Sequence, residues 1–460
     1  MINKRTINIL ILLSVLFLSL IVYLTYFQIV TSEKLSDNPY NMRQQIYEDD
    51  IERGDILDRD GVVLATNENN QRIYPFANMY AHVIGYDSPV YGKSMLEAKY
   101  NRQLTGQSGI SQAFSMPGDK LGYDLMLTID HDLQRLASEQ LGNKNGAVIA
   151  MNPRNGEILA MVSKPNFDPN PDILASNWTN LTDSESFPFL PRATSGLYAP
   201  GSTFKIITGV TAIEYGLSDT IFDDRGTIRI GSKDFANYQN KSYGEIDMFR
   251  GFEVSSNVVY CSLGAQLGSA ALKTSAERFG FNKIFDFDVQ MSKSIFPDNQ
   301  NDDELAAALA IGQGKILATP LQMAMVTAAI ANDGEMMKPM LIKSVRNKNG
   351  ISLMNTRPQK LYNCVSYDVA YQIQQAMVNT VKNGTGTGVA INGITVGAKT
   401  GTAENERTSR QNNKEHTWFT AFAPAEDPQI VVTIMMEYSG GTGAGNCAPI
   451  AREIIRKHLQ

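Results

Sequence analysis

The chain has 460 residues, of which 43% are hydrophobic and 19% charged, and its formal net charge is −6. A chain of this length is expected to hold two or more folded units. Because Lys and Arg give no basic excess and are spread along the chain, the composition argues against a nucleic-acid-binding protein, and we predict no nucleic-acid partner.

An uncharged apolar segment lies near the N-terminus. Residues 6–32 contain no charged side chain, and Ile, Leu, Val, Phe and Tyr dominate residues 9–30. Such a run can cross a bilayer, which takes about 20 apolar residues, whereas a buried core helix rarely runs this long without a charge. No small-residue cleavage site follows, so we predict an uncleaved single-pass anchor over residues 9–30. The positive-inside rule, applied to Lys4 and Arg5, keeps residues 1–8 in the cytoplasm and places the rest of the chain outside the membrane.

Residues 31–142 are predicted to form a small mixed domain. An Asp-Gly turn signal at position 60 lies between short apolar runs, which predicts an extended hairpin over residues 53–65. We expect a helix over residues 94–104. A second, amphipathic helix is predicted over residues 130–141, where the apolar positions repeat with helical spacing on one face, at Leu133, Leu136, Ala137 and Leu141.

The composition changes at Gly146, and residues 143–460 are predicted to form the second domain. Two strand-like runs flank a Pro, Asn and Gly-rich turn at residues 152–156. Three further strands and a closing helix are expected near the C-terminus. The predicted strands are residues 147–151, 158–162, 394–403, 418–423 and 430–436, and the helix is residues 448–458. The simplest assembly is a sheet built from both ends of this segment, with helices between.

The sharpest local motif is A-P-G-S-T-F-K at residues 199–205, followed by an apolar helical run at residues 206–213. Pro and Gly end the preceding loop, so Ser202 should lie at a helix N-terminus. Residues three apart share a helix face, which brings the Ser202 hydroxyl and the Lys205 amine within hydrogen-bonding reach. The helix dipole and burial both disfavour the ammonium form of Lys205. We therefore expect Lys205 to act as a base for the nucleophile Ser202.

Two further motifs follow in a fixed order. An S-x-x-K match alone is weak, because roughly two are expected by chance in a chain of this length. Here Ser255-Ser256-Asn257 comes about fifty residues later, and Lys399-Thr400-Gly401-Thr402 lies on a predicted strand. A second S-x-N match, Ser36-Asp37-Asn38, precedes the nucleophile beside the anchor and is discarded. S-x-x-K, an S-x-N triplet and K-T-G in this order form the signature of penicillin-binding proteins and class A β-lactamases.

On these motifs the chain resembles a class B penicillin-binding protein, a monofunctional D,D-transpeptidase of the penicillin-binding protein and serine β-lactamase superfamily. Residues 53–65 also resemble the family's R-G-x-I-x-D-R-x-G signature, and Gly312-Gln313-Gly314 and Gly384-Thr385-Gly386 have family counterparts. Pro191 and Ala398 depart from the usual Asn and Gly. The resemblance implies an α+β fold: a transmembrane helix, a non-catalytic pedestal domain, and a transpeptidase domain with a central antiparallel sheet flanked by helices.

The resemblance also implies roles for the motif residues. Ser202 would attack the carbonyl of a D-alanyl-D-alanine stem peptide while Lys205 takes its proton. Ser255 would relay that proton to the leaving amine, and Asn257 would hold Lys205 and the substrate amide.

The Lys399 motif would bind the substrate. Lys399 would supply positive charge near the substrate carboxylate, and the hydroxyls of Thr400 and Thr402 would hydrogen-bond that carboxylate. Gly401 would let the strand approach the substrate closely. The backbone N–H groups of Ser202 and Thr402 would form the oxyanion hole.

The function that follows is peptidoglycan cross-linking through a Ser202 acyl-enzyme, inhibited covalently by β-lactams, with no metal or organic cofactor. A β-lactamase and a non-catalytic β-lactam sensor or scaffold are the alternatives. The expected partners are stem peptides, β-lactams, and a multi-pass membrane glycan polymerase of the division or elongation machinery.

The three cysteines, Cys261, Cys364 and Cys447, are odd in number and widely spaced, which argues against a disulfide framework. A zinc site is disfavoured, and Cys261 would be its main candidate.

Overall fold

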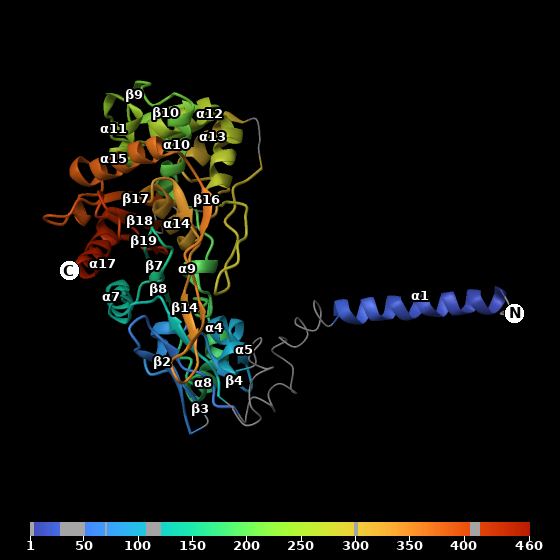
Figure 1. Cartoon of the computed structure of the whole chain (residues 1–460). Helices are drawn as coiled ribbons and strands as arrows, with labels where there is room; N and C mark the ends of the chain where they lie inside the picture. Colours follow the sequence, from blue (N-terminus) through green and yellow to red (C-terminus); the bar gives the residue numbers. More distant parts are fainter. Residues whose placement is uncertain (1–3, 28–50, 70, 107–120, 299–301, 405–414) are drawn as a thin grey trace.

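The computed structural model describes residues 4–27, 51–69, 71–106, 121–298, 302–404 and 415–460 (Figure 1). The first element is the helix α1 (Lys4–Tyr26), which contains an 18-residue window with a mean hydropathy of 2.7 and has no buried residue. It begins five residues before the predicted anchor, because the helix extends back from the apolar run to include Lys4 and Arg5. The last predicted anchor positions, 28–30, lie outside the described residues.

The lower lobe in Figure 1 is organised around a six-stranded sheet with the order β15-β14-β6-β1-β2-β3. The predicted hairpin is confirmed, since β1 pairs antiparallel with β2. Its turn is closed by the Asp58 carboxylate, which accepts from the N–H groups of Asp60 and Val62 at 2.9 and 2.8 Å. The strands are β1 (Ile56–Leu57), β2 (Val63–Glu68), β3 (Gln71–Ile73), β6 (Asp124–Leu127), β14 (Ile342–Arg346) and β15 (Ser352–Asn355).

The hairpin β14–β15 comes from far along the chain and was not expected in this sheet. It adds to β6 in antiparallel register, with Val345 opposite Leu125. The predicted domain boundary at residue 142 stays a prediction, and this pairing joins residues from both sides of it.

The predicted helix over residues 94–104 is two short helices instead, α4 (Met95–Lys99) and α5 (Asn101–Leu104). Tyr100 interrupts them with non-helical angles, φ −107° and ψ 22°. The break accompanies a buried charge cluster, in which the Glu97 carboxylate accepts from Arg53 Nε and Arg72 Nε at 2.7 Å each. Because an unpaired buried carboxylate is strongly unfavourable, these two ion pairs fix the position of α4.

The upper lobe is built on a five-stranded antiparallel sheet with the order β17-β18-β19-β7-β8. The prediction of a sheet assembled from both ends of the segment is therefore confirmed. The strand expected from residue 394 starts only at Gly397, because Ile394 turns back to pair with Ile391. The strands are β7 (Gly146–Met151), β8 (Ile158–Lys164), β17 (Gly397–Ala403), β18 (His416–Ala423) and β19 (Ile430–Met436).

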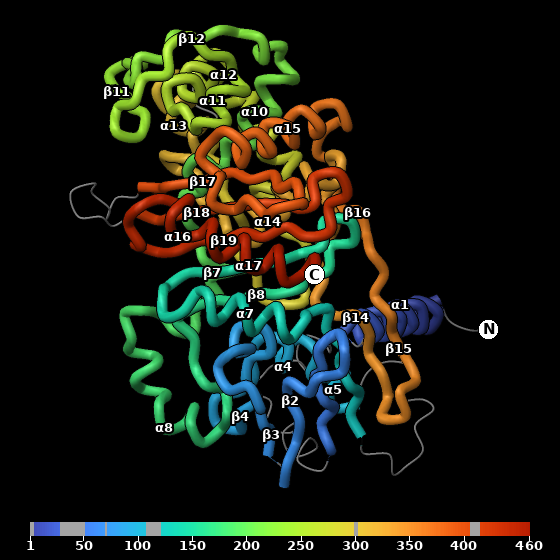
Figure 2. The backbone as a smooth tube through the Cα atoms, turned by 90° about the vertical axis from the view of Figure 1, so that its left-hand side faces the viewer, coloured from blue at the N-terminus to red at the C-terminus, as the bar shows by residue number. Residues whose placement is uncertain are grey.

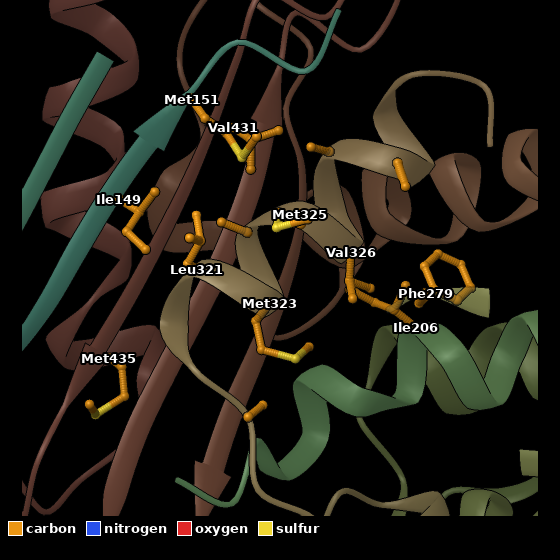
Figure 3. Packing of buried hydrophobic residues seen from close by; sticks show 14 of the residues in the cluster. Ile149, Met151, Ile206, Phe279, Leu321, Met323, Met325, Val326, Val431 and Met435 are labelled. Carbon is orange, nitrogen blue, oxygen red and sulfur yellow. The ribbon is translucent and has the colours of Figure 1, made fainter. Parts of the chain in front are cut away.

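Helices cover both faces of this sheet. The amphipathic helix α7 (His131–Leu141) is confirmed, and it packs with α17 (Ala448–Leu459) on one face, although Leu136 is only half-buried. On the other face lies α14 (Pro320–Ala331), all twelve residues of which are buried. Figure 3 shows α14 side chains packed among Ile149 and Val431 of the sheet. A helix apolar on every side is expected at such a central position.

The helices beyond α14 form the top of the molecule in Figures 1 and 2, where β17 is the strand of the five-stranded sheet that lies nearest to them. They are α10 (Lys205–Glu214), α11 (Met248–Glu253), α12 (Asn257–Arg278), α13 (Asp303–Ala310) and α15 (Tyr367–Asn383). Two small two-stranded antiparallel sheets lie beside them, β9 (Phe222–Asp224) with β12 (Gly244–Ile246) and β10 (Thr227–Ile230) with β11 (Lys233–Ala236). The other described elements are β4 (Asp87–Ser88), β5 (Gly92–Lys93), β13 (Glu335–Met337), β16 (Lys360–Asn363), α8 (Pro171–Thr182), α9 (Arg192–Ser195), α16 (Gly443–Asn446), η2 (Ala77–Tyr80), η3 (Gly201–Phe204), η4 (Tyr238–Asn240) and η5 (Thr387–Val389).

Candidate active site

Ser202 lies in η3, a single 3-10 turn that runs directly into α10. The predicted position at a helix N-terminus is confirmed. Gly201 adopts φ +53°, and a Cβ there would lie 2.5 Å from the Thr402 carbonyl oxygen, so only glycine fits. Thr203 Oγ1 closes the turn by donating to the Pro200 carbonyl at 2.7 Å. The turn thus presents a half-buried Ser202 beside strand β17.

The Lys205 amine is held by the S-x-N segment. Its Nζ donates to Asn257 Oδ1 at 2.8 Å and to the carbonyls of Ser255 and Ser256 at 2.9 and 3.1 Å. In the described part of the chain it forms no hydrogen bond with Ser202, although helix spacing predicts that the two groups can meet. Three acceptors on one turn hold the amine, which explains this difference.

Burial sets the protonation of Lys205. The side chain is fully buried, and no salt bridge joins it to a carboxylate of the described residues. Desolvation therefore lowers the pKa of Lys205 to about 7, against smaller opposing effects of Cys261 and Asp224. Near neutral pH about half of the amine is free to accept a proton.

Lys399 forms a hydrogen bond with the hydroxyl of Ser255. Its Nζ donates to Ser255 Oγ at 2.8 Å and to the Thr400 carbonyl at 3.2 Å, while Lys205 Nζ lies 3.4 Å from the same Oγ. Lys399 is also fully buried, and burial, followed by the nearby Lys205, holds its pKa well below the usual value. Ser255 adopts φ +59°, a costly conformation for serine. This strained residue places one hydroxyl between two lysine amines.

Strand β17 closes the site as the edge strand of the sheet. Thr400 Oγ1 shares a hydrogen bond with Thr385 Oγ1 at 2.8 Å, in the Gly-Thr-Gly segment after α15. A Cβ at Gly401 would lie 2.9 Å from Trp418 Cβ and 3.0 Å from Thr203 Cγ2. Gly401 therefore lets β17 lie close to the serine turn, and Thr402 stands half-buried beside it.

The turn at Gly312 and Gln313 carries a structural role that the sequence did not reveal. The Gly201 N–H donates to the Gly312 carbonyl at 2.9 Å. The Gln313 side-chain amide faces the backbone of Glu404. With the amide oxygen and nitrogen assigned to suit these neighbours, it donates to the Glu404 carbonyl at 3.0 Å and accepts from the Glu404 N–H at 3.3 Å. One turn thereby ties the serine turn to the end of β17. No composition or spacing rule predicts such a contact, because it joins three segments that are distant along the chain.

The cysteines lie apart from one another and are all buried thiols. Cys261 sits on α12, and burial raises its pKa to about 12. Among the described residues, no group of three His, Cys, Asp or Glu side chains is placed to hold a metal ion. The Cys261 side chain packs in the core as a small apolar residue would.

Comparisons with known proteins agree with this geometry. Residues 146–456 match the model of the penicillin binding protein transpeptidase domain, and residues 53–116 match that of the penicillin binding protein A dimerisation domain. The peptidoglycan D,D-transpeptidase PbpA of Mycolicibacterium smegmatis is 31% identical over 97% of this chain and 97% of its own length. The peptidoglycan D,D-transpeptidase MrdA of Acinetobacter baumannii is 29% identical over 84% of this chain, which spans 65% of that protein.

Solved structures give the same result. Penicillin-binding protein A from M. tuberculosis, as a penicillin G acyl-enzyme complex, aligns with a TM-score of 0.82 and 30% identity over 89% of this chain and 100% of that one. The D,D-transpeptidase domain of a peptidoglycan glycosyltransferase from Eggerthella lenta aligns with a TM-score of 0.80 and 36% identity over 89% of this chain and 98% of that one. The fold is that of the active-serine penicillin-binding enzymes. The chain belongs to the penicillin-binding protein transpeptidase family, and within it to class B.

Substitution of Gly312 tests the link between the two turns. Gly312 has φ +71°, and a Cβ there would lie 2.1 Å from the Gly201 carbonyl oxygen. Gly312→Ala should displace the Ser202 turn and slow acylation by penicillin about 100-fold, since a 1 Å misplacement can cost this much. The rate of covalent labelling by a fluorescent penicillin measures the effect.

Gly314→Ala is the matched control for this experiment. Gly314 has a similar φ of +79°, but the nearest atoms to its Cβ would be 3.8 Å away. The control should lose a similar amount of stability through its backbone, about 1–2 kcal/mol, and keep most of its labelling rate. Equal labelling rates for the two variants would contradict the proposed contact.

Proposed function

We propose that this protein is a membrane-anchored peptidoglycan D,D-transpeptidase that forms an acyl-enzyme at Ser202 and is inhibited covalently by β-lactams. The observation that carries the proposal is a serine at a helix N-terminus, with a buried lysine of pKa about 7 on the next turn. Membership of the transpeptidase family and the acyl-enzyme complexes of a relative support it.

The acylation step follows from these positions. Ser202 Oγ attacks the carbonyl of the terminal D-alanyl-D-alanine bond, and its proton passes to Lys205 as the C–O bond forms. The N–H groups of Ser202 and Thr402 stabilise the oxyanion of the tetrahedral intermediate. The proton then passes from Lys205 through Ser255 Oγ to the nitrogen of the leaving D-alanine. An acceptor amine completes the reaction by the reverse sequence, giving the cross-link and regenerating the Ser202 hydroxyl.

The substrate-binding half of the site consists of β17 and the S-x-N segment. The outer edge of β17 can pair with an extended peptide, as edge strands commonly do. The terminal carboxylate of the substrate brings Lys399 the anionic partner that its buried amine lacks, which favours the charged form of that amine. Lys399 then supplies positive charge for the carboxylate, and the hydroxyls of Thr400 and Thr402 hydrogen-bond it. The Asn257 side chain, already bound to Lys205, orients the substrate amide.

Loss of the nucleophile is the first test. Ser202→Ala should abolish covalent labelling by a fluorescent penicillin, because no acyl-enzyme can form. Ser176→Ala, an exposed serine on α8, is the control and should label normally. Wild-type protein should remain labelled for many minutes, since rapid turnover of penicillin would favour a β-lactamase. Labelling of the Ser202→Ala variant would refute the assignment.

The acylation rate should depend on pH through Lys205. A base with a pKa of about 7 is protonated below that pH, so the rate constant should fall about tenfold per unit below pH 6 and level off above pH 8. Below about pH 7 the amine is protonated in both folded and unfolded chains, so it adds no pH dependence to stability there. A thermal midpoint that stays well above the assay temperature at every pH would separate this effect from unfolding, and a rate independent of pH would contradict it.

The protein is further proposed to work beside a multi-pass membrane glycan polymerase of the elongation or division machinery, with its N-terminus cytoplasmic and residues 143–460 outside. The fully exposed apolar surface of α1 supports contact within the bilayer. Replacing residues 4–27 with an unrelated apolar span should weaken co-purification with that polymerase. Undiminished co-purification would contradict the contact.

The orientation of the chain has a test of its own. A membrane-impermeant penicillin should label intact spheroplasts, and a lack of labelling would contradict the orientation.

A further inference from the structure

A buried carboxylate lies behind the Lys205 amine, outside the three sequence motifs. Asp224, at the end of β9, is fully buried and forms no salt bridge with a cation of the described residues. Its carboxylate accepts from Ser256 Oγ at 2.6 Å and from the Gly226 N–H at 2.9 Å. Both oxygens also accept from Asn237 Nδ2, at 2.8 and 2.9 Å. A buried carboxylate survives only when hydrogen-bonded in this way.

Asn237 passes this arrangement on to the S-x-N segment. Its Oδ1 accepts from the backbone N–H groups of Asn257 and Val258 at 2.7 and 3.1 Å. These are the first N–H groups of α12, which have no partner within the helix. Asn237 Nδ2 faces Asp224 and also donates to the Lys241 carbonyl at 2.8 Å. The carboxylate and this carbonyl together fix which way the amide points, and the amide fixes the start of α12.

Ser256 provides a second connection. Its hydroxyl donates to Asp224 and accepts from the Val259 N–H at 3.1 Å, as the N-cap of α12. The residue on one side, Ser255, has the strained left-handed backbone, and the residue on the other, Asn257, binds the Lys205 amine. The segment that holds the amine is therefore held in turn by Asp224, directly and through Asn237.

We propose that Asp224 is a positioning residue for acyl transfer, acting through Asn237 and Ser256 to hold residues 255–257 in the geometry that orients the Lys205 amine and the Ser255 hydroxyl. The inference rests on the proposed function and adds to it a group that the three motifs do not contain.

The charge of Asp224 also acts on Lys205. The titratable groups facing that amine are Lys399 from β17, Cys261 and Tyr260 from α12, and Asp224 from β9. Burial raises the pKa of Tyr260, so its phenol is neutral. Asp224 opposes the effect of burial on the pKa of Lys205, and with the Cys261 thiol protonated it is the anion in this group. Removing its charge should therefore lower the pKa of Lys205 further. This effect gives the proposal a signature that loss of structure alone would not produce.

Asp224→Asn in the full-length protein is the direct test. An amide offers one acceptor oxygen where the carboxylate offers two, so one contact with Asn237 is lost. The acylation rate constant for a fluorescent penicillin, measured from pH 5 to 9, should fall about tenfold or more on its plateau, and its acid limb should move to lower pH by roughly 0.5–1 unit. Asp223→Asn, the exposed neighbour on the same strand, is the matched control and should change neither.

A swap variant separates positioning from stability. Combining Asp224→Asn with Asn237→Asp keeps one carboxylate and one amide facing each other, but it replaces the N–H that Asn237 donates to the Lys241 carbonyl with an oxygen. The swap should therefore recover part of the plateau rate and most of the position of the acid limb. A wild-type plateau and limb in Asp224→Asn would overturn the proposal. If Asp224→Asn does not fold, the swap variant decides. A folded swap variant with the wild-type acid limb supports the proposal. A folded swap variant that is not acylated, or failure of both variants to fold, overturns it. Wild-type protein that penicillin does not acylate would instead refute the proposed function.

Discussion

Two lysine amines buried around one serine hydroxyl are the constraint on which the site depends. Lys205 and Lys399 are both fully buried, and both amines lie within 3.4 Å of Ser255 Oγ. A buried ammonium without a carboxylate partner is unfavourable, so the protein lowers the pKa of both groups instead of pairing them. The free energy of folding thus keeps a large fraction of the Lys205 amine neutral near physiological pH. An exposed Lys205 would be almost fully protonated there and unable to take a proton from serine.

Keeping these amines dry requires three segments that are distant in sequence to close on one another. The serine turn is held against β17 by Gly201 and Gly401, at positions where a side chain would collide with backbone or packed neighbours. The Gly312 turn ties both together, and α12 closes the third side. The sheet makes this possible because its two ends come from the two ends of the domain, which places β17 at the edge beside the helices (Figure 2). The pairing of β14 with β6 joins this unit to the six-stranded sheet of the lower lobe.

Much of this arrangement can be predicted from local patterns. The strands β7, β8 and β19 and the helices α7 and α17 follow from apolar periodicity and turn signals, and the helix N-terminus at Ser202 follows from Pro200 and Gly201. The resemblance implied that Asn257 holds Lys205, and the structure confirms this contact. Spacing identifies which side chains share a face, but not which backbone acceptors compete for an amine, so the bonds of Lys205 to the carbonyls of Ser255 and Ser256 were not foreseen. Local patterns also do not show contacts between distant segments. The pairing of β14 with β6 in the six-stranded sheet and the hydrogen bond of Ser256 to Asp224 were missed for this reason. The interruption at Tyr100 accompanies the buried ion pairs of Glu97, which no local pattern shows.

The central claim is that burial holds Lys205 as a neutral base, and direct titration of its amine is the sharpest test. Protein labelled with [ε-¹³C]lysine would report each Cε resonance by NMR as the pH is raised. The account predicts one resonance with a midpoint at about 7 that disappears in Lys205→Arg. If the resonance lost in that variant titrates near the ordinary lysine value of about 10.4, the proposed base is protonated at neutral pH and the account is wrong.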